Sequence, residues 1–254
     1  MDRFLFEYVL RLADSGLILS QRLAQWCGHG PALEEDLALT NVSLDLLGQA
    51  RMWYALAGAV EGAGRDEDAL AFLRDAAQFR NYLLVEQDNG HYGDTMVRQF
   101  FFDTWHYLLL ERLGGSGQKD IAAIAEKSLK EVAYHARRSG DIVVRLGDGT
   151  DESHAKMQAA VDAIWRYTGE LFVDDEVTAD MASRRWAPMH DELRPAWLDH
   201  VARVLAQATL AAPDSIQADH PAHRGGIVGR HTEALGYLLA EMQYLQRAYP
   251  GASW

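Results

Sequence analysis

The chain lacks the features that would place it in a membrane or outside the cell. No apolar run approaches the roughly 18 residues that a transmembrane helix needs. There is one cysteine, Cys27, so the chain can form no internal disulfide. The opening Met-Asp-Arg-Phe-Leu-Phe-Glu has no uninterrupted apolar segment of the kind found in secretory signals. We therefore expect a cytoplasmic protein without a membrane span.

Basic residues are also scarce. The sequence has 24 lysines and arginines against 37 acidic residues, which gives a net charge of −13. No basic stripe with interleaved aromatic residues offsets this charge, and an acidic surface repels phosphate backbones. Nucleic acid is therefore not an expected partner. The apolar content of 48% is sufficient for a sizeable core.

Hydrophobic periodicity predicts an all-α architecture. Apolar residues at steps of three and four predict a first helix that ends near Cys27, before a Gly-His-Gly-Pro turn. A second stripe predicts a long helix over 33–61, which must return antiparallel to the first after so short a loop. Residues 2–61 thus form one predicted hairpin. Residues 66–85 are predicted to form a shorter helix.

The hairpin pattern then repeats. Helices are predicted over 94–113 and 118–146, separated by Gly114-Gly115-Ser116-Gly117, so residues 94–146 form a second hairpin. Two long hairpins predict a four-helix bundle. Peripheral helices are predicted near 151–172, with Asp151 as candidate cap, near 193–210 and near 228–249, while 173–192 is predicted to be polar and irregular. We expect a single domain over 1–254.

One helix contains an incomplete metal-binding motif. Leu46 and Gln49 have the spacing at which a ferritin-like di-iron helix has a Glu and a His on one face. Leucine has no ligand atom, and an amide is a poor iron ligand. The sequence therefore predicts a ferritin-like four-helix bundle with peripheral helices, no metal, no bound cofactor and no catalytic residue.

Residues that resemble metal ligands remain elsewhere in the predicted bundle. Tyr134 stands where a histidine would complete a motif with Glu131, and His135 follows one position late. The larger weight goes to a structural interpretation, in which each carboxylate is hydrogen-bonded or paired with a base and each histidine is a core residue. Sequence proximity suggests Lys127, Lys130 or Arg51 as partners for the carboxylates of Asp103 and Glu131. The complete set of residual ligand-like residues is Asp14, Asp103, His106, Glu131 and His135.

Two other clusters are weaker candidates. His220, His223 and His231 with Asp219 have irregular spacing, which favours a solvated loop over a zinc site. The glycine-rich segment 225–229 superficially resembles a phosphate loop, but no strand is predicted before it and no Lys-Ser/Thr follows. The long loop Ala212 to Gly229 is a candidate contact surface.

Several segments resemble one known family, the PaaC subunits of the bacterial phenylacetyl-CoA 1,2-epoxidase. They are LSQRLAQWCGHGPALEEDLALTNVSLDLLGQAR (19–51), NYLLVEQDNGHYGDT (81–95), KEVAYH (130–135), WRYTGELF (165–172) and AEMQYLQRAYPGASW (240–254). The resemblance implies a multicomponent monooxygenase acting in phenylacetate degradation. In it a related catalytic alpha subunit holds the di-iron centre and binds the CoA substrate, with Glu-Leu-Gly-His at the positions of residues 46–49.

The same resemblance implies the other components. These are a small bridging subunit and a reductase with FAD and an iron–sulfur centre, which draws electrons from NADPH. The subunits that this chain resembles are the non-catalytic partners of the alpha subunit. A structural subunit is therefore the favoured hypothesis, and a homodimer of this chain is a further assembly that the sequence allows.

The alternative is a self-sufficient di-iron or ferritin-like metalloprotein. Its ligands would come from the residual set together with Asp45. Iron content distinguishes the two hypotheses.

Overall fold

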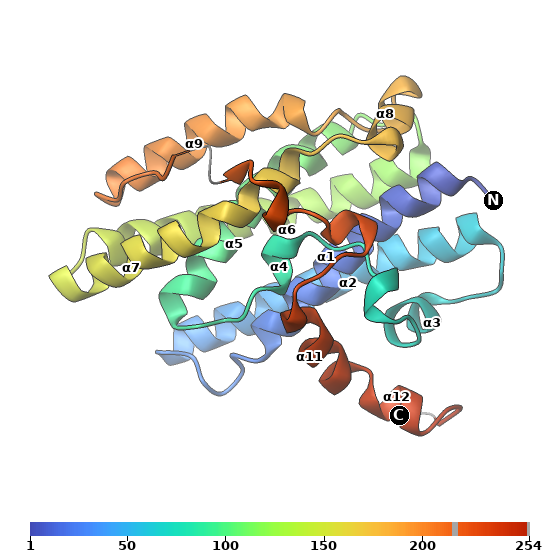
Figure 1. The fold of residues 1–254 in the computed structure, drawn as a ribbon, viewed down its shortest axis with the longest axis horizontal. Helices are drawn as coiled ribbons and strands as arrows, with labels where there is room; N and C mark the ends of the chain where they lie inside the picture. The colour runs from blue at the N-terminus through green and yellow to red at the C-terminus, as the bar shows by residue number, and fades with distance from the viewer. Residues whose placement is uncertain (215–217, 253–254) are drawn as a thin grey trace. The chain divides into compact units, whose positions relative to one another are not determined.

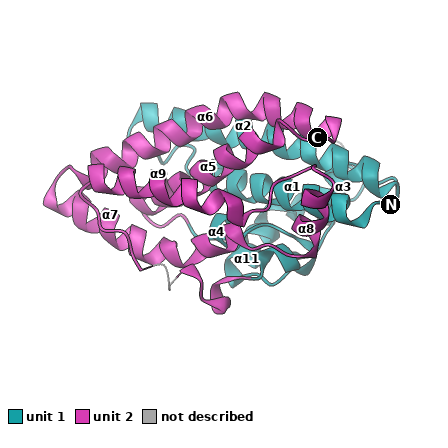
Figure 2. Ribbon diagram, turned by 90° about the horizontal axis from the view of Figure 1, so that it is seen from above, with its two compact units in different colours: residues 1–88, 225–254 teal, residues 89–224 magenta. Residues whose placement is uncertain are grey.

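The computed structural model describes residues 1–214 and 218–252, and these residues are organised as α-helices and short 3₁₀ helices without a β-strand. The all-α class is therefore confirmed. Figure 1 shows the helices in chain order. The chain divides into two compact units, Met1–Asp88 with Gly225–Trp254, and Asn89–Arg224, which are coloured separately in Figure 2. No helix among the described residues is both long and apolar enough to cross a membrane. A bundle formed by both predicted hairpins together, and a single domain over 1–254, stay predictions.

Unit 1 is built on the hairpin of α1 (Arg3–Ala24) and α2 (Leu33–Glu61), which pack along each other. The Asp2 side chain accepts a hydrogen bond from the main-chain N–H of Leu5 and so caps the start of α1. Acidic residues in the first turn of α2 stabilise the helix through its dipole, whose N-terminal end is positive. Gly62 ends the helix in the left-handed conformation at φ 67°. The predicted bounds of the second helix are confirmed, whereas the first ends three residues early.

The rest of unit 1 differs from the prediction. Residues 66–85 form α3 (Glu67–Phe72), η1 (Ala76–Gln78) and α4 (Leu83–Glu86) instead of one helix. The chain ends in α11 (Glu233–Met242) and α12 (Tyr244–Ala248), which replace the helix predicted over 228–249. Between them, the buried Gln243 donates to the main-chain oxygens of Ala71 and Arg74 at 3.1 and 3.0 Å.

The glycine-rich segment fits closely against unit 1. A Cβ on Gly226 would lie 2.2 Å from the carbonyl oxygen of Asn81, and one on Gly229 would lie 2.3 Å from that of Ala77. In the described part of the chain no strand precedes this segment, which forms the short η5 (Gly226–Val228). Its glycines therefore allow close backbone packing, with Gly226 and Ile227 buried and Val228 exposed. Residues 215–217 of the predicted contact loop, and the last two residues of the chain, lie outside the described residues.

Unit 2 contains the second hairpin, α5 (Tyr92–Leu113) and α6 (Lys119–Gly147). These bounds lie within two residues of the prediction. The other elements are α7 (Asp151–Ile164), η2 (Trp165–Phe172), α8 (Glu176–Ser183), η3 (Asp191–Leu193), α9 (Arg194–Gln207) and η4 (Pro221–His223).

Three predictions about these peripheral elements need correction. The helix predicted over 151–172 is α-helical only to Ile164 and continues as a 3₁₀ helix. Its cap is Thr150, whose hydroxyl accepts from the main-chain N–H of Ser153, and not Asp151. The segment 173–192 contains α8, whose first turn is capped by the Asp175 side chain.

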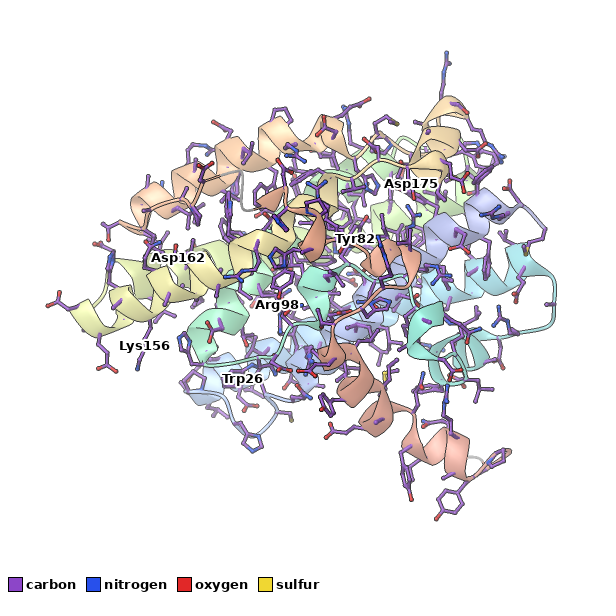
Figure 3. The ribbon with its side chains drawn as sticks, in the orientation of Figure 1. Trp26, Tyr82, Arg98, Lys156, Asp162 and Asp175 are labelled. Atoms are coloured by element: carbon purple, nitrogen blue, oxygen red, sulfur yellow. The ribbon has the colours of Figure 1, made fainter. Side chains whose placement is uncertain are left out.

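The core of unit 2 is rich in aromatic residues. Trp165 and Phe101 make an edge-to-face contact with ring centroids 5.5 Å apart, and Trp197 donates its indole N–H to the main-chain oxygen of Phe101 at 2.9 Å. Figure 3 contrasts Arg98 on α5, which is completely buried, with Lys156 on α7, which is exposed. The unit thus buries some polar side chains within an aromatic interior.

Candidate functional site

The incomplete metal motif on α2, Leu46 and Gln49, is buried but contains no good metal ligand. Leu46 is completely buried and Gln49 is only 2% exposed, so both lie in the interior of unit 1 as the helix period predicts. Asp45, the extra ligand of the metalloprotein hypothesis, is half-buried on the same helix. An interior leucine at a ligand position removes one donor atom outright.

Asp14 on α1 is completely buried and accepts hydrogen bonds at both carboxylate oxygens. Its Oδ1 accepts from the Tyr54 hydroxyl at 2.5 Å and from the Arg74 guanidinium. Its Oδ2 accepts from the same guanidinium at 3.0 Å and from the main-chain N–H of Arg80 at 2.7 Å. With two donors on each oxygen, the carboxylate has no lone pair directed at an empty position.

The charge of Asp14 is balanced inside unit 1 by Arg74. Burial acts to lower the pKa of the Arg74 guanidinium, but the neighbouring Asp14 carboxylate and Tyr54 outweigh burial and raise that pKa. Burial first, and Asp14 second, raise the pKa of the Tyr54 phenol well above 10.0, so the phenol stays a donor. Arg74 also lies over the Phe79 ring, 4.3 Å from its centroid. A guanidinium therefore occupies the position of a cation beside Asp14, and these residues do not fit an iron site.

Asp103 on α5 has a different environment in unit 2. It is also completely buried, but its Oδ1 accepts from the Gln99 amide at 2.6 Å and its Oδ2 has no hydrogen-bond partner among the described residues. Burial raises the pKa of the Asp103 carboxyl from 3.8 to about 6, against the opposing effects of His135, Ser139, Gln99 and Arg138. The group is thus an acid poised to be neutral in mildly acidic solution.

The remaining ligand-like residues of unit 2 do not form a set of metal ligands. Burial, followed by the neighbouring His135, lowers the pKa of His106 to about 3, so His106 is a neutral core imidazole beside the Trp105 ring. On α6, His135 is buried, Glu131 is half-buried and Tyr134 is 43% exposed. Among the residues that the structure describes, no three His, Cys, Asp or Glu side chains converge as they would around a metal ion.

The predicted partners of Asp103 are wrong. Its hydrogen-bond partner is Gln99, whereas Lys127 and Lys130 are exposed on α6. Arg51 is in unit 1, where it donates to Glu67 at 2.7 and 2.9 Å. The side chain that reaches Asp103 lies one turn earlier on the same helix, at the i−4 position. The pairing suggested for Glu131 stays a prediction.

His231 also differs from the solvated loop residue that the sequence predicts. Its side chain is 4% exposed, and its Nδ1 lies 2.8 Å from Oε2 of the completely buried Glu86. Its Nε2 lies 3.0 Å from the main-chain oxygen of Phe79. By contrast, Asp219 pairs with Arg194 and Arg224 in unit 2.

The other contacts of Glu86 determine the charge of His231. Glu86 accepts from the N–H and the hydroxyl of Thr232 at 2.7 and 2.9 Å, and from the Asn81 amide at 2.8 Å. The carboxylate oxygens of Glu86 therefore act as acceptors in all of these hydrogen bonds. Because both ring nitrogens of His231 face acceptors, His231 must donate from both and is a cationic imidazolium. The hydrogen bond and charge of Glu86 outweigh burial and raise the pKa of His231.

Comparisons with known proteins show the family of this chain. A family model described as phenylacetic acid catabolic protein matches residues 1–254. The chain belongs to this family. It is also 50% identical over 250 residues to one of the subunits of the 1,2-phenylacetyl-CoA epoxidase of Escherichia coli (strain K12), covering 98% of this chain and 99% of that protein. Membership supports a role in phenylacetate catabolism and confirms the family resemblance found in the sequence.

Proposed function

We propose that this chain is a structural subunit of a multicomponent di-iron monooxygenase that epoxidises the ring of phenylacetyl-CoA in the cytoplasm. It supports a related catalytic subunit and has lost its own metal site. The other components are a bridging subunit and a reductase with FAD and an iron–sulfur centre that uses NADPH. The likeness to the Escherichia coli epoxidase subunit supports this assignment.

The observation that weighs most is the Arg74–Asp14 pair in the unit that contains Leu46 and Gln49. A di-iron site places two cations about 4 Å apart and needs several carboxylates to compensate their charge. Among the described residues of unit 1, the cation that pairs with Asp14 is the guanidinium of its own chain, and α2 adds no carboxylate at Leu46. A helical unit of this kind has no set of ligands for two irons.

Iron analysis of the purified chain tests the loss of the metal site. We expect well below one equivalent of iron and no oxo-bridged absorbance after aerobic iron loading. The double variant Leu46→Glu with Gln49→His should bind no more iron, because Arg74 remains paired with Asp14. Two tightly bound irons per wild-type chain would instead support the self-sufficient metalloprotein.

Co-expression tests the supporting role. The catalytic subunit is produced with and without this chain, and its soluble yield and NADPH-coupled epoxidation are measured with the other components present. We expect both to fall without this chain, and no turnover of phenylacetyl-CoA by this chain alone. An obligate interface of this kind buries more than roughly 2,000 Å². Equal yield and activity with and without the chain would contradict the proposal.

A further inference from the structure

The two longest helices of the described chain differ in the faces that they expose. Both α2 and α6 have 29 residues. The exposed face of α6 is charged and includes Lys127, Lys130, Arg137, Asp141 and Arg145. The exposed face of α2 is mainly apolar, with Leu33, Leu37 and Leu44 exposed by 71%, 54% and 59%. An exposed apolar face on one helix, where an equally long helix exposes charges, indicates a contact that this chain alone does not make.

Apart from Glu34 in the first turn, the exposed residues of α2 form one continuous stripe. They follow one another at steps of three or four residues, the spacing of a single helix face. We call this the α2 face and define it by Leu33, Leu37, Asn41, Leu44, Gly48, Arg51, Ala55 and Ala59. From Leu37 to Val60, counting all sides of the helix, only Asp45 and Arg51 are charged.

Gly48 near the middle of the α2 face is a second, independent observation. A Cβ built on this glycine would meet nothing within 4 Å, so packing within this chain does not require glycine there. Glycine is much less favourable than alanine in the middle of a helix. Its remaining use is to let another backbone approach closely.

We propose that the α2 face is the docking surface for an apolar helix of the catalytic subunit, which crosses α2 at Gly48. The identity of this partner rests on the proposed function. The contact is between helices, because the bare backbone at Gly48 lies between larger side chains such as Leu44 and receives a ridge of a second helix.

Charge favours a different chain over a second copy. The α2 face is bordered by the acidic residues Glu34, Asp36 and Asp45. A second copy would bring two acidic borders and two net charges of −13 together, which opposes association. The occupant therefore has an apolar helix with basic residues on its flanks. An anionic lipid surface is disfavoured by the same charge.

The size of the α2 face indicates that docking extends beyond it. A helix of 29 residues is about 43 Å long, and a strip about 10 Å wide along it offers on the order of 400 Å². In an obligate interface of roughly 2,000 Å² or more, each partner buries on the order of 1,000 Å². Half-buried apolar residues at the sides of the stripe, such as Leu47, Met52 and Leu56, widen the surface toward that requirement.

The test measures binding of the catalytic subunit to the full chain. The double variant Leu37→Glu with Leu44→Glu, and separately Gly48→Phe, should weaken binding roughly 10- to 100-fold, as expected for central interface residues. The matched control is Leu198→Glu on α9, another exposed leucine at 39% exposure. It should bind as the wild type does. Circular dichroism and thermal melting establish that each variant is folded. Because a Cβ at Gly48 meets nothing within 4 Å, a side chain there should not disturb the fold, and Gly48→Phe tests the surface separately from the leucine variants.

Each outcome has a separate meaning. If the wild type binds and both variants bind equally well, the α2 docking surface is wrong while the proposed function stands. If the wild type does not bind, the proposed function fails and this partner with it. A wild-type homodimer that the variants dissociate, with binding of the catalytic subunit unchanged, would assign the face to a second copy and overturn the proposal. If the wild type binds anionic vesicles and the variants do not, the proposal is overturned in favour of a lipid surface.

Discussion

Two aspartates, one in each unit, are completely buried in helices and yet have opposite surroundings. Asp14 in unit 1 receives donors at both oxygens and the full charge of Arg74. Asp103 in unit 2 receives one amide hydrogen bond and has a pKa raised to about 6. Burial is the same, so the donors decide whether a carboxylate stays charged. In unit 1 an arginine compensates the carboxylate, whereas unit 2 retains an acid that burial pushes toward its neutral form.

Removing Arg74 should have the largest effect, because it leaves Asp14 charged and buried. We expect Arg74→Met to lower the free energy of unfolding by about 3–5 kcal/mol, measured by urea denaturation. Adding Asp14→Asn should recover part of the loss, since the uncompensated charge is then gone. Arg203→Met, in an exposed pair with Asp199, serves as the control and should change little. An Arg74→Met variant as stable as the wild type would mean that the pair does not neutralise Asp14.

Asp103→Asn should stabilise the protein at neutral pH, because it removes a buried carboxyl whose folded pKa is raised. The unfolded carboxyl ionises near pH 3.8 and the folded one near 6, so the folded state binds the extra proton between these values. Stability therefore falls as the pH rises through this window, by about 3 kcal/mol for a shift of this size. In the variant, the amide oxygen still accepts the hydrogen bond from Gln99. The amide does not titrate, so this pH dependence of stability disappears. Denaturation at pH 4 and pH 8 should show a gain only at pH 8, and a loss at pH 8 would contradict the assignment.

His231→Gln should remove a pH dependence from unit 1. Because the folded pKa of His231 is raised above 6.5, its stabilisation is complete below the unfolded value and is lost as the pH rises through the folded value. Two hydrogen bonds to a charged ring suggest a contribution of about 2 kcal/mol. The free energy of unfolding, measured from pH 6 to pH 9, should be higher for the wild type at low pH, and the difference from the variant should shrink as the pH rises. Parallel curves for the two proteins would rule out a cationic His231.

Gly48→Ala should have the smallest effect and a positive one. A Cβ at this position meets nothing, so the isolated chain should gain about 1 kcal/mol from the better helix propensity of alanine. Thermal melting of the purified chain measures it. Gly236, which is equally open but lies near the C-terminus of the chain on α11, provides a comparison through Gly236→Ala. A loss of stability at residue 48 would mean that the glycine is required within the chain itself.

The sequence predicted the parts of the fold that depend on local pattern. The bounds of α2 and the burial of Leu46, Gln49, Asp14 and Asp103 follow from a helical period repeated over many residues. The segment 66–85 was predicted wrongly, because long-range contacts interrupt it. Its Arg74 and the N–H of Arg80 bond to Asp14, which lies 60 and 66 residues earlier.

The partners of the buried charges could not be predicted for the same reason. Tyr54, Arg74 and His231 have no spacing relation to the carboxylates that they contact. Hydrophobic periodicity predicts which side chains are buried, but not which side chains distant in the sequence contact them. Only a three-dimensional arrangement reveals that Asp14 is neutralised, and that the predicted solvated His231 is buried.

Unit 1 is assembled from both ends of the chain, which has a consequence for biosynthesis. His231, Thr232 and Gln243 bond to residues between Ala71 and Glu86, but a ribosome releases these partners last, at about 5–20 residues per second. Unit 2 is complete in the nascent chain before unit 1 receives its final segment. Until then Glu86 has no imidazolium to pair with. A chain truncated before Gly225 should therefore contain all the residues of unit 2 but an incomplete unit 1.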